Sequence, residues 1–313
     1  MNQMIFSKII NKLYYLYNKY INLMFKNRYI QKILGFILHI ELKNIIYVRF
    51  IFGSLILVGE KVTYKIGLYP GSLEREILHR EIIAIQYPDI EKIIVPVVIK
   101  KIFWINIIKM STYNKVETTD IFSTVKVLQE PFCKYKVSKK LFLNDFEIIN
   151  NGLDFLFKEM KNYEIDLFKK YIESLLLKEK EFAPAHGDFH LGNILQKNNE
   201  CSLLIDLDCF RKLNFIWMDE TYFLVEYILN VKYNDKLSWM EFVILILNKD
   251  EEALKYIIDN QYINNEILMY EDMFILYYLD RLGQELMYSV DVNKNWNTKF
   301  MKESLKFMVN KNA

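Results

Sequence analysis

Short apolar runs separated by turn residues characterise the chain after Asn44. The runs are rich in β-branched and aromatic residues and are bounded by Gly, Ser or Pro, which is typical of strands. They predict strands at 45–52, 55–59, 62–68, 95–99 and 104–110, the first three forming a meander. Ser72 follows Pro70-Gly71 and can cap a helix that extends to about Tyr87. The pattern predicts a small antiparallel sheet with one helix.

From residue 139 onward, apolar residues recur at helical spacing instead. The stretches with this periodicity are 139–180, 217–230, 238–247 and 269–288. They predict a second part that is mainly helical and that buries its apolar stripes in a core. The expected fold class is therefore α+β, in two parts.

Residues 1–44 have a different character, since they carry seven Lys or Arg and a single acidic residue, Glu41, among apolar residues at helical spacing. This predicts a basic amphipathic helical extension. It has no uninterrupted apolar span of about 18 residues, which argues against a membrane-crossing helix. Several interpretations remain open: helices packed on the following lobe, peripheral contact with an anionic membrane surface, or partner binding or disorder.

The overall composition adds little to this picture. The chain has 313 residues, of which 52% are hydrophobic, enough for a substantial core. A net charge of +2 gives no case for nucleic-acid binding. Three scattered cysteines, Cys133, Cys201 and Cys209, indicate a reducing compartment, and we expect a cytoplasmic protein.

The candidate chemistry is concentrated in residues 184–208. Asp188 is followed five positions later by Asn193, and an apolar run delivers a second carboxylate, Asp206. Phosphoryl transfer needs a group that orients an attacking hydroxyl and oxygen ligands for Mg²⁺. We expect Asp188 to accept the proton of the hydroxyl, and Asn193 and Asp206 to bind the metal. Residues 193–196 and 201–205 read as a hairpin.

Two other kinds of metal site were considered for the same stretch. His186 and His190 lie four residues apart, but Gly187 and Gly192 argue against the helix that a zinc pair would use. A metal-dependent phosphoesterase would use several dispersed histidines, and no His follows residue 190. Both interpretations lack ligands.

The motif resembles the catalytic and metal-binding segments of the aminoglycoside phosphotransferase and choline kinase families. Their pattern is His-Gly-Asp, four residues, Asn, and then a strand that ends in Ile-Asp. It is met here by the set His186, Gly187, Asp188, Asn193, Ile205 and Asp206. The resemblance implies a protein-kinase-like two-lobed fold, with a small antiparallel-sheet N-lobe at 45–112 and a larger helical C-lobe at 113–313. It also implies ATP and Mg²⁺ as cofactors.

Further site residues follow from the resemblance. Lys65, in the third strand, is expected at the nucleotide phosphates, with Glu81 as its ion-pair partner and Glu76 as the alternative. Gly53 and Ser54 fall where the families place a phosphate-covering loop, although the loop is short here. Adenine is expected near Met110, with 127–131 as a competing crossing between the lobes.

Three acidic residues near the motif have no single expected role. Asp208 would share a strand face with Asp206 if that strand continued, and could assist the metal. Asp219 and Glu220 lie where related enzymes support the catalytic loop or contact substrate, or they could simply begin a helix.

The sequence thus predicts an ATP-dependent kinase that phosphorylates a hydroxyl group of a small molecule, such as an aminoglycoside-, choline- or sugar-like acceptor. The acceptor itself and the oligomeric state stay open. The alternatives are a nucleotide-binding pseudokinase or interaction module and, with less support, a metal-dependent phosphoesterase.

Overall fold

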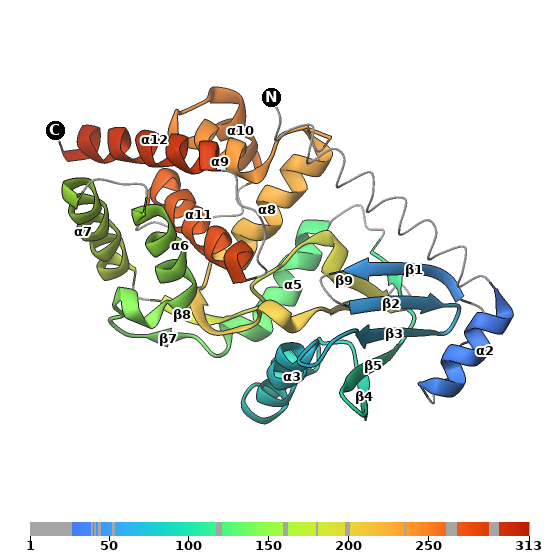
Figure 1. Cartoon of the computed structure of the whole chain (residues 1–313). Helices are drawn as coiled ribbons and strands as arrows, with labels where there is room; N and C mark the ends of the chain where they lie inside the picture. The colour runs from blue at the N-terminus through green and yellow to red at the C-terminus, as the bar shows by residue number, and fades with distance from the viewer. Residues whose placement is uncertain are drawn as a thin grey trace. The chain divides into compact units, whose positions relative to one another are not determined.

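The structure is a computed structural model, and it forms two compact units (Figure 1). It describes residues 27–38, 40, 42, 45–51, 54–116, 121–158, 162–179, 181–197, 201–234, 236–260, 268–287 and 294–312. The first unit contains the described residues up to Lys115 together with Leu195–Asp208, and the second contains Val116–Ile194 and the described residues from Cys209 onward. The two units are described separately below.

A five-stranded antiparallel sheet with strand order β1-β2-β3-β5-β4 forms the centre of the first unit. Its strands are β1 (Ile45–Ile51), β2 (Ser54–Gly59), β3 (Val62–Gly67), β4 (Val97–Ile102) and β5 (Ile105–Ser111). Alternate residues such as Leu57, Tyr64 and Ile66 point into a core, as the two-residue period of a strand requires. The strands predicted from the sequence are confirmed to within three residues at each end.

The described residues of the first unit include the helices α2 (Arg28–Ile37), α3 (Glu74–Gln86) and the short α4 (Pro88–Glu91). The predicted cap of α3 is wrong, because Leu73 is the N-cap residue, with a φ of 68°, and no side chain caps the helix. Ser72 is buried, and its Oγ accepts a hydrogen bond from Tyr69 N at 3.4 Å. The predicted extension 1–44 is described only in part, since residues 1–26 lie outside the described residues.

The segment that carries Asp206 joins the first unit through backbone hydrogen bonds. β9 (Ile194–Lys197) and β10 (Cys201–Leu204) are neighbours in a sheet with β6 (Asn114–Lys115), as the predicted hairpin requires. Val95 N donates to Leu204 O at 3.0 Å, and Leu204 N donates to Ile93 O at 2.8 Å. The predicted second lobe comprised all of residues 113–313. In the structure, Leu195–Asp208 belongs to the first unit instead.

The second unit is mainly helical. Its helices are α5 (Ile121–Cys133), α6 (Glu147–Phe157), α7 (Asn162–Lys178), α8 (Met218–Val231), α9 (Trp239–Leu247), α10 (Glu251–Asn260), α11 (Tyr270–Met287) and α12 (Lys294–Asn312). A small sheet of order β11-β8-β7 accompanies them, from β7 (Val137–Ser138), β8 (Glu181–Ala185) and β11 (Arg211–Phe215). The competing crossing at 127–131 is wrong, because those residues lie inside α5.

Helix α11 lies in the core of the second unit and packs against α6, α8 and α9 (Figure 1). Its contact with α6 depends on two glycines. A Cβ added at Gly283 would lie 1.9 Å from Ile148 O, and one added at Gly152 would lie 2.3 Å from Leu279 O. The two backbones therefore approach more closely than any larger residue would allow, which fixes α11 and its polar side chains in position.

Candidate functional site

Lys65 is the centre of a charged cluster in the first unit. Its Nζ donates to Glu76 Oε2 at 2.8 Å and to Asp206 Oδ1 at 2.9 Å, and its side chain is largely buried. Burial by itself lowers the pKa of Lys65. The carboxylates of Asp206 and Glu76 raise that pKa by more than burial lowers it, so the net pKa lies well above the usual value. The amine is therefore charged throughout the accessible pH range.

Glu76 is the buried partner that holds Lys65. Its other oxygen, Oε1, accepts hydrogen bonds from Arg80 Nη2 at 3.0 Å and Arg80 Nε at 3.2 Å. Burial raises the pKa of Glu76, but the charges of Lys65 and Arg80 outweigh it and lower the pKa below the usual range. Arg80 also donates to Val95 O at 3.0 Å, which ties α3 to the chain before β4.

The expected pairing of Lys65 with Glu81 is wrong. Glu81 is exposed, and Glu76 makes the ion pair. The two glutamates are five positions apart on α3, which rotates them about 140° around the helix axis, so only one can face the sheet. The sequence did contain a signal for Glu76, because Arg80 lies four positions after it on the same helix face. A neighbouring arginine can neutralise a glutamate and so allow it to be buried.

Asp206 follows β10 and has a positive φ of 61°. Its side chain is partly exposed, and only Oδ1 is bound to Lys65. His79 Nδ1 lies 2.7 Å from Leu207 O and so anchors the next residue to α3. Asp208 lies in a short 3₁₀ helix, Leu207–Cys209; the strand ends at Leu204, so the shared face expected for Asp208 does not form.

The other expected nucleotide residues have simpler surroundings. Ser54 is buried at the start of β2, where it pairs with Gly67 of β3 and Ile51 of β1. Gly53 lies outside the described residues. Met110 lies near the end of β5 between Thr63 and Val97 in the sheet. Adenine contact near Met110 stays a prediction.

In the second unit, β8 leads into the loop that carries Asp188. Gly187 has a φ of 80°, and a Cβ there would lie 2.0 Å from Cys209 O, so only glycine fits. The buried carboxylate of Asp219 accepts hydrogen bonds from His186 N at 2.6 Å and Gly187 N at 2.9 Å. Asp219 thus supports the loop, one of the three roles considered for it.

Asp188 is held by Asn193 and Arg281. Asn193 Nδ2 donates to Asp188 O at 2.9 Å and to Asp188 Oδ2 at 3.3 Å, which closes the loop on itself. Arg281 Nη1, from α11, donates to Asp188 Oδ1 at 3.1 Å. His190 Nε2 lies 3.5 Å from Asp188 Oδ2. The structure thus brings Asp188 and Asn193 together, as expected from their spacing.

The charges around Asp188 keep it ionised. Burial raises the pKa of the carboxyl group, but the His190 hydrogen bond and the Arg281 guanidinium lower it more, so that the net pKa lies well below the usual range. Arg281 is shared with two further acids, since Glu226 Oε1 and Glu285 Oε1 each lie 3.7 Å from its nitrogens. A carboxylate with a lowered pKa that contacts both Arg281 and His190 is well oriented and weakly basic.

Sequence reasoning missed Arg281, Glu226 and Glu285. Arg281 lies 93 residues after Asp188, on a helix that reads as an ordinary amphipathic segment. Its i, i+4 pairing with Glu285 would suit a solvent-exposed helix equally well. The sequence therefore contains no local signal for this contact.

The expected metal ligands lie in different units, and their role in binding Mg²⁺ stays a prediction. The Asp206 carboxylate of the first unit and the Asn193 amide oxygen of the second are each hard oxygen atoms of the kind that Mg²⁺ prefers, and Asn193 turns its Nδ2 toward Asp188. Within the described ranges, no group of three or more His, Cys, Asp and Glu side chains is placed to hold a metal ion. Mg²⁺ needs no such group, because it is usually bound by one or two carboxylates together with substrate phosphates and water.

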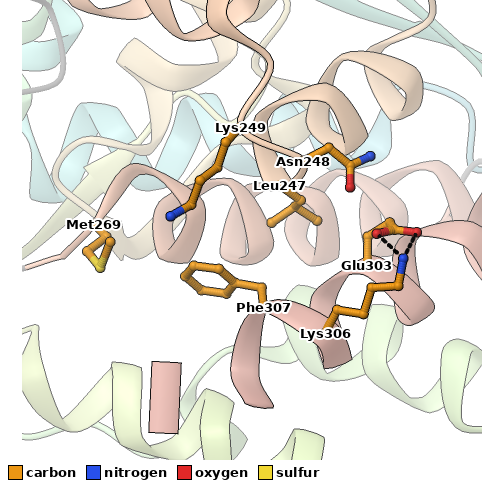
Figure 2. Close-up of a pocket in the computed structure, with 7 residues that line it drawn as sticks. All are labelled: Leu247, Asn248, Lys249, Met269, Glu303, Lys306 and Phe307. Atoms are coloured by element: carbon orange, nitrogen blue, oxygen red, sulfur yellow. Dashed lines mark hydrogen bonds and ion pairs between the residues drawn. The ribbon is translucent and has the colours of Figure 1, made fainter. Parts of the chain in front are cut away.

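A pocket of about 370 Å³ lies elsewhere in the second unit (Figure 2). It is lined by Leu247, Asn248, Lys249, Met269, Glu303, Lys306 and Phe307. None of the site residues predicted from the sequence lines it. Lys306 is bound to Glu303 at 3.0 Å, and Phe307 closes one wall (Figure 2).

Comparisons with known proteins agree in fold. No protein-family model matches the sequence, and no curated protein is significantly similar to it. Choline kinase LicA from Streptococcus pneumoniae is similar in structure, with a TM-score of 0.50 at 13% sequence identity over 90% of this chain and 99% of that protein.

Two further solved structures are similar at lower TM-scores. They are an ethanolamine kinase from Plasmodium vivax (TM-score 0.47, 14% identity, 83% of this chain and 80% of that one) and spectinomycin phosphotransferase bound to AMP (TM-score 0.45, 14% identity, 90% and 94%).

Among the described residues, no helix combines the length and apolar character needed to cross a bilayer. The antiparallel sheet, the helical unit and the likeness to choline kinase together show that the chain has a protein-kinase-like fold.

Proposed function

We propose that the protein is an ATP-dependent, Mg²⁺-requiring phosphotransferase that acts on a hydroxyl group of a small molecule. One observation carries the proposal: the buried Lys65 of β3 is bound both to Glu76 of α3 and to Asp206 after β10. A strand lysine paired with a helix glutamate, beside a metal-binding aspartate, is the arrangement that kinase-like enzymes need for their nucleotide.

On the nucleotide side, Lys65 contributes a permanent positive charge for the phosphate oxygens of ATP. Glu76 and Arg80 hold the Lys65 ammonium in place, so the Lys65 side chain loses little conformational entropy when the nucleotide binds. Asp206 and Asn193 would hold Mg²⁺, which neutralises phosphate charge when it is bound. Backbone groups near Met110 would bind adenine, and the Gly53-Ser54 turn would cover the phosphates.

On the acceptor side, Asp188 takes the hydroxyl proton. The acceptor oxygen forms a bond to the γ-phosphorus, the bond between that phosphorus and the β,γ-bridging oxygen breaks, and ADP leaves with the electron pair. Asp188 is ionised when it begins this step, because His190 and Arg281 stabilise its charge. Asn193 and Asp219 keep its loop in one conformation.

A nucleotide-consumption screen tests the proposal. The full-length chain is incubated with Mg·ATP and a panel of hydroxyl compounds that includes choline, ethanolamine, aminoglycosides and sugars. We expect ADP release that depends on one acceptor class and on Mg²⁺, and that is lost in Asp188→Asn. ATP binding without turnover on any acceptor would instead indicate a nucleotide-binding module, and phosphoester hydrolysis without ATP would indicate a phosphoesterase.

A further inference from the structure

Helix α2 carries an apolar stripe on its exposed side. Gln31 and Gly35 are buried, and a Cβ added at Gly35 would lie 2.8 Å from Ile40 O. Tyr29, Ile33 and Phe36 lie at i, i+4 and i+7 and are 78%, 57% and 81% exposed. A surface helix of a globular protein normally has the reverse orientation, with its apolar stripe inward. The stripe therefore presents apolar side-chain surface to solvent.

The turn between β4 and β5 has the same character. Phe103 and Trp104 are 83% and 58% exposed, and their ring centroids lie 6.0 Å apart. Phe103 has a φ of 55°, a conformation that two-residue hairpin turns normally give to Gly or Asn. Two aromatic side chains thus occupy a turn where they gain little burial and where one of them strains the backbone.

Both features adjoin one apolar cluster. Leu38 and Leu42, which follow α2, are buried in a cluster with residues of β1, β2, β3 and β5. Ile102 and Ile105, which flank the turn, pack against the same cluster. The outward stripe and the aromatic turn therefore belong to one region of the first unit, and we call their five exposed side chains the aromatic face.

Exposed lysines accompany the aromatic face. Among the described residues, neither α2 nor Val97–Ser111 contains an Asp or Glu. Lys32 of α2 and Lys101 beside the turn are both exposed. Lysine is depleted in protein–protein interfaces, whereas aromatic residues beside lysines are typical of segments that lie on anionic bilayers.

We propose that the aromatic face docks the first unit onto an anionic phospholipid surface. The rings of Tyr29, Phe36 and Trp104 enter the boundary between headgroups and acyl chains, where amphipathic aromatic side chains are favoured. The lysines contact the headgroup phosphates and add a long-range attraction. None of these side chains is among the candidate nucleotide, metal or acceptor residues, so the proposal is independent of the proposed phosphotransferase activity.

Vesicle flotation of the full-length chain tests the docking. We expect the protein to float with vesicles of phosphatidylcholine mixed with phosphatidylserine and not with vesicles of phosphatidylcholine alone. Added NaCl should release it, because salt screens the attraction between the lysines and the headgroups. Lack of binding to the mixed vesicles would overturn the proposal.

Two double variants probe the aromatic face directly. Ile33→Ser with Phe36→Ser, and Phe103→Ser with Trp104→Ser, should each weaken binding about tenfold or more, because apolar area is no longer buried in the lipid. Leu78→Ser with Ile85→Ser is the matched control, since these side chains of α3 are 52% and 80% exposed in the same unit. Lys32→Glu and Lys101→Glu should each weaken binding roughly fivefold or more.

The controls separate lipid binding from other occupants of the aromatic face. Circular dichroism confirms that each variant is folded. If the control pair lost as much binding as the aromatic pairs, the attraction would not be specific to this face. If sedimentation showed a dimer that the aromatic variants convert to monomer, the face would be a contact between copies of the chain, and the membrane proposal would be wrong.

Discussion

The Lys65 cluster and the Asp188 loop both rely on ion pairs, but the cation and the acid exchange roles between them. In the first unit a cation is the candidate functional group, and the acids Glu76 and Asp206 hold it. In the second unit an acid is the candidate functional group, and the cation Arg281 holds it with help from His190. Each functional side chain thereby keeps its charge despite burial, since an opposite charge offsets the loss of hydration.

The two regions differ in the sequence separation between the functional side chain and the residues that hold it. Asp188 owes most of its geometry to neighbours within five residues, because Gly187 allows the turn and Asn193 closes it. Lys65 owes its geometry to residues 11 and 141 positions away. A local loop can be read from a motif, whereas a cluster assembled from distant segments requires the fold.

The largest effect is expected for Asp188→Asn, which keeps the size of the side chain but removes its charge and basicity. Turnover should fall by roughly 10²–10⁴, the usual contribution of a general base. Binding of Mg·ATP should stay nearly intact, because Asp188 is proposed to act on the acceptor. Steady-state kinetics with the acceptor found in the screen, together with calorimetric titration of Mg·ATP, measures both quantities.

Asp206→Asn is the counterpart in the first unit. It should weaken binding of Mg·ATP itself, since a charged ligand to a hard divalent cation is lost. If Asp188→Asn abolished nucleotide binding and Asp206→Asn left it unchanged, the assignment of roles to the two carboxylates would be inverted.

The Lys65 cluster can be broken through its buried acid. Glu76→Gln leaves Lys65 and Arg80 facing a neutral amide, and removing one partner of a buried ion pair destabilises a protein by about 3–5 kcal/mol. We expect a loss of this order in urea denaturation, and a raised KM for ATP because Lys65 is no longer held. Glu81→Gln on the same helix is the control, with an expected change within about 0.5 kcal/mol. Equal losses in both variants would contradict the Lys65–Glu76 pairing.

Glu220 sharpens the comparison because it is a partly buried acid whose pKa is raised and not lowered. Burial raises its pKa from 4.5 to about 7, and the charge of Lys126 offsets this only in part. The folded state therefore binds the proton more tightly than the unfolded chain does, so this contribution to stability is complete below about pH 4.5 and is lost as the pH rises through about 7. Glu220→Gln should remove that dependence and stabilise the protein at alkaline pH by on the order of 3 kcal/mol.

Thermal unfolding across pH tests this behaviour. The wild type should lose stability between the two pKa values relative to Glu220→Gln, and the curves should run parallel elsewhere. Parallel curves over the whole range would show that Glu220 is not perturbed by burial.

The smallest effect is expected for Arg281→Gln. Arg281 helps to keep the pKa of Asp188 low, so its loss should raise that pKa and move the acid limb of the kcat profile to higher pH. We expect turnover to fall about tenfold at the acidic end, equivalent to about 1.4 kcal/mol, and less at alkaline pH. Arg281→Lys should restore part of the profile. A uniform loss at every pH would indicate a structural role only.

The local parts of this protein could be predicted from the sequence. The strand pattern of 45–68, the hairpin that precedes Asp206 and the spacing of Asp188 and Asn193 were all readable, because each depends on neighbours within a few residues. The protein-kinase-like fold followed from the motif and agrees with the likeness to choline kinase.

The pairing of distant charges could not be predicted, because it depends on how helices and strands pack. Glu81 was expected beside Lys65, but the orientation of α3 on the sheet buries Glu76 there instead. Asp219 and Arg281 reach the Asp188 loop from α8 and α11, across separations of 32 to 93 residues. The spacing of charges along a helix says which residues share a face, but helix packing selects the face that is buried, and packing depends on the whole core.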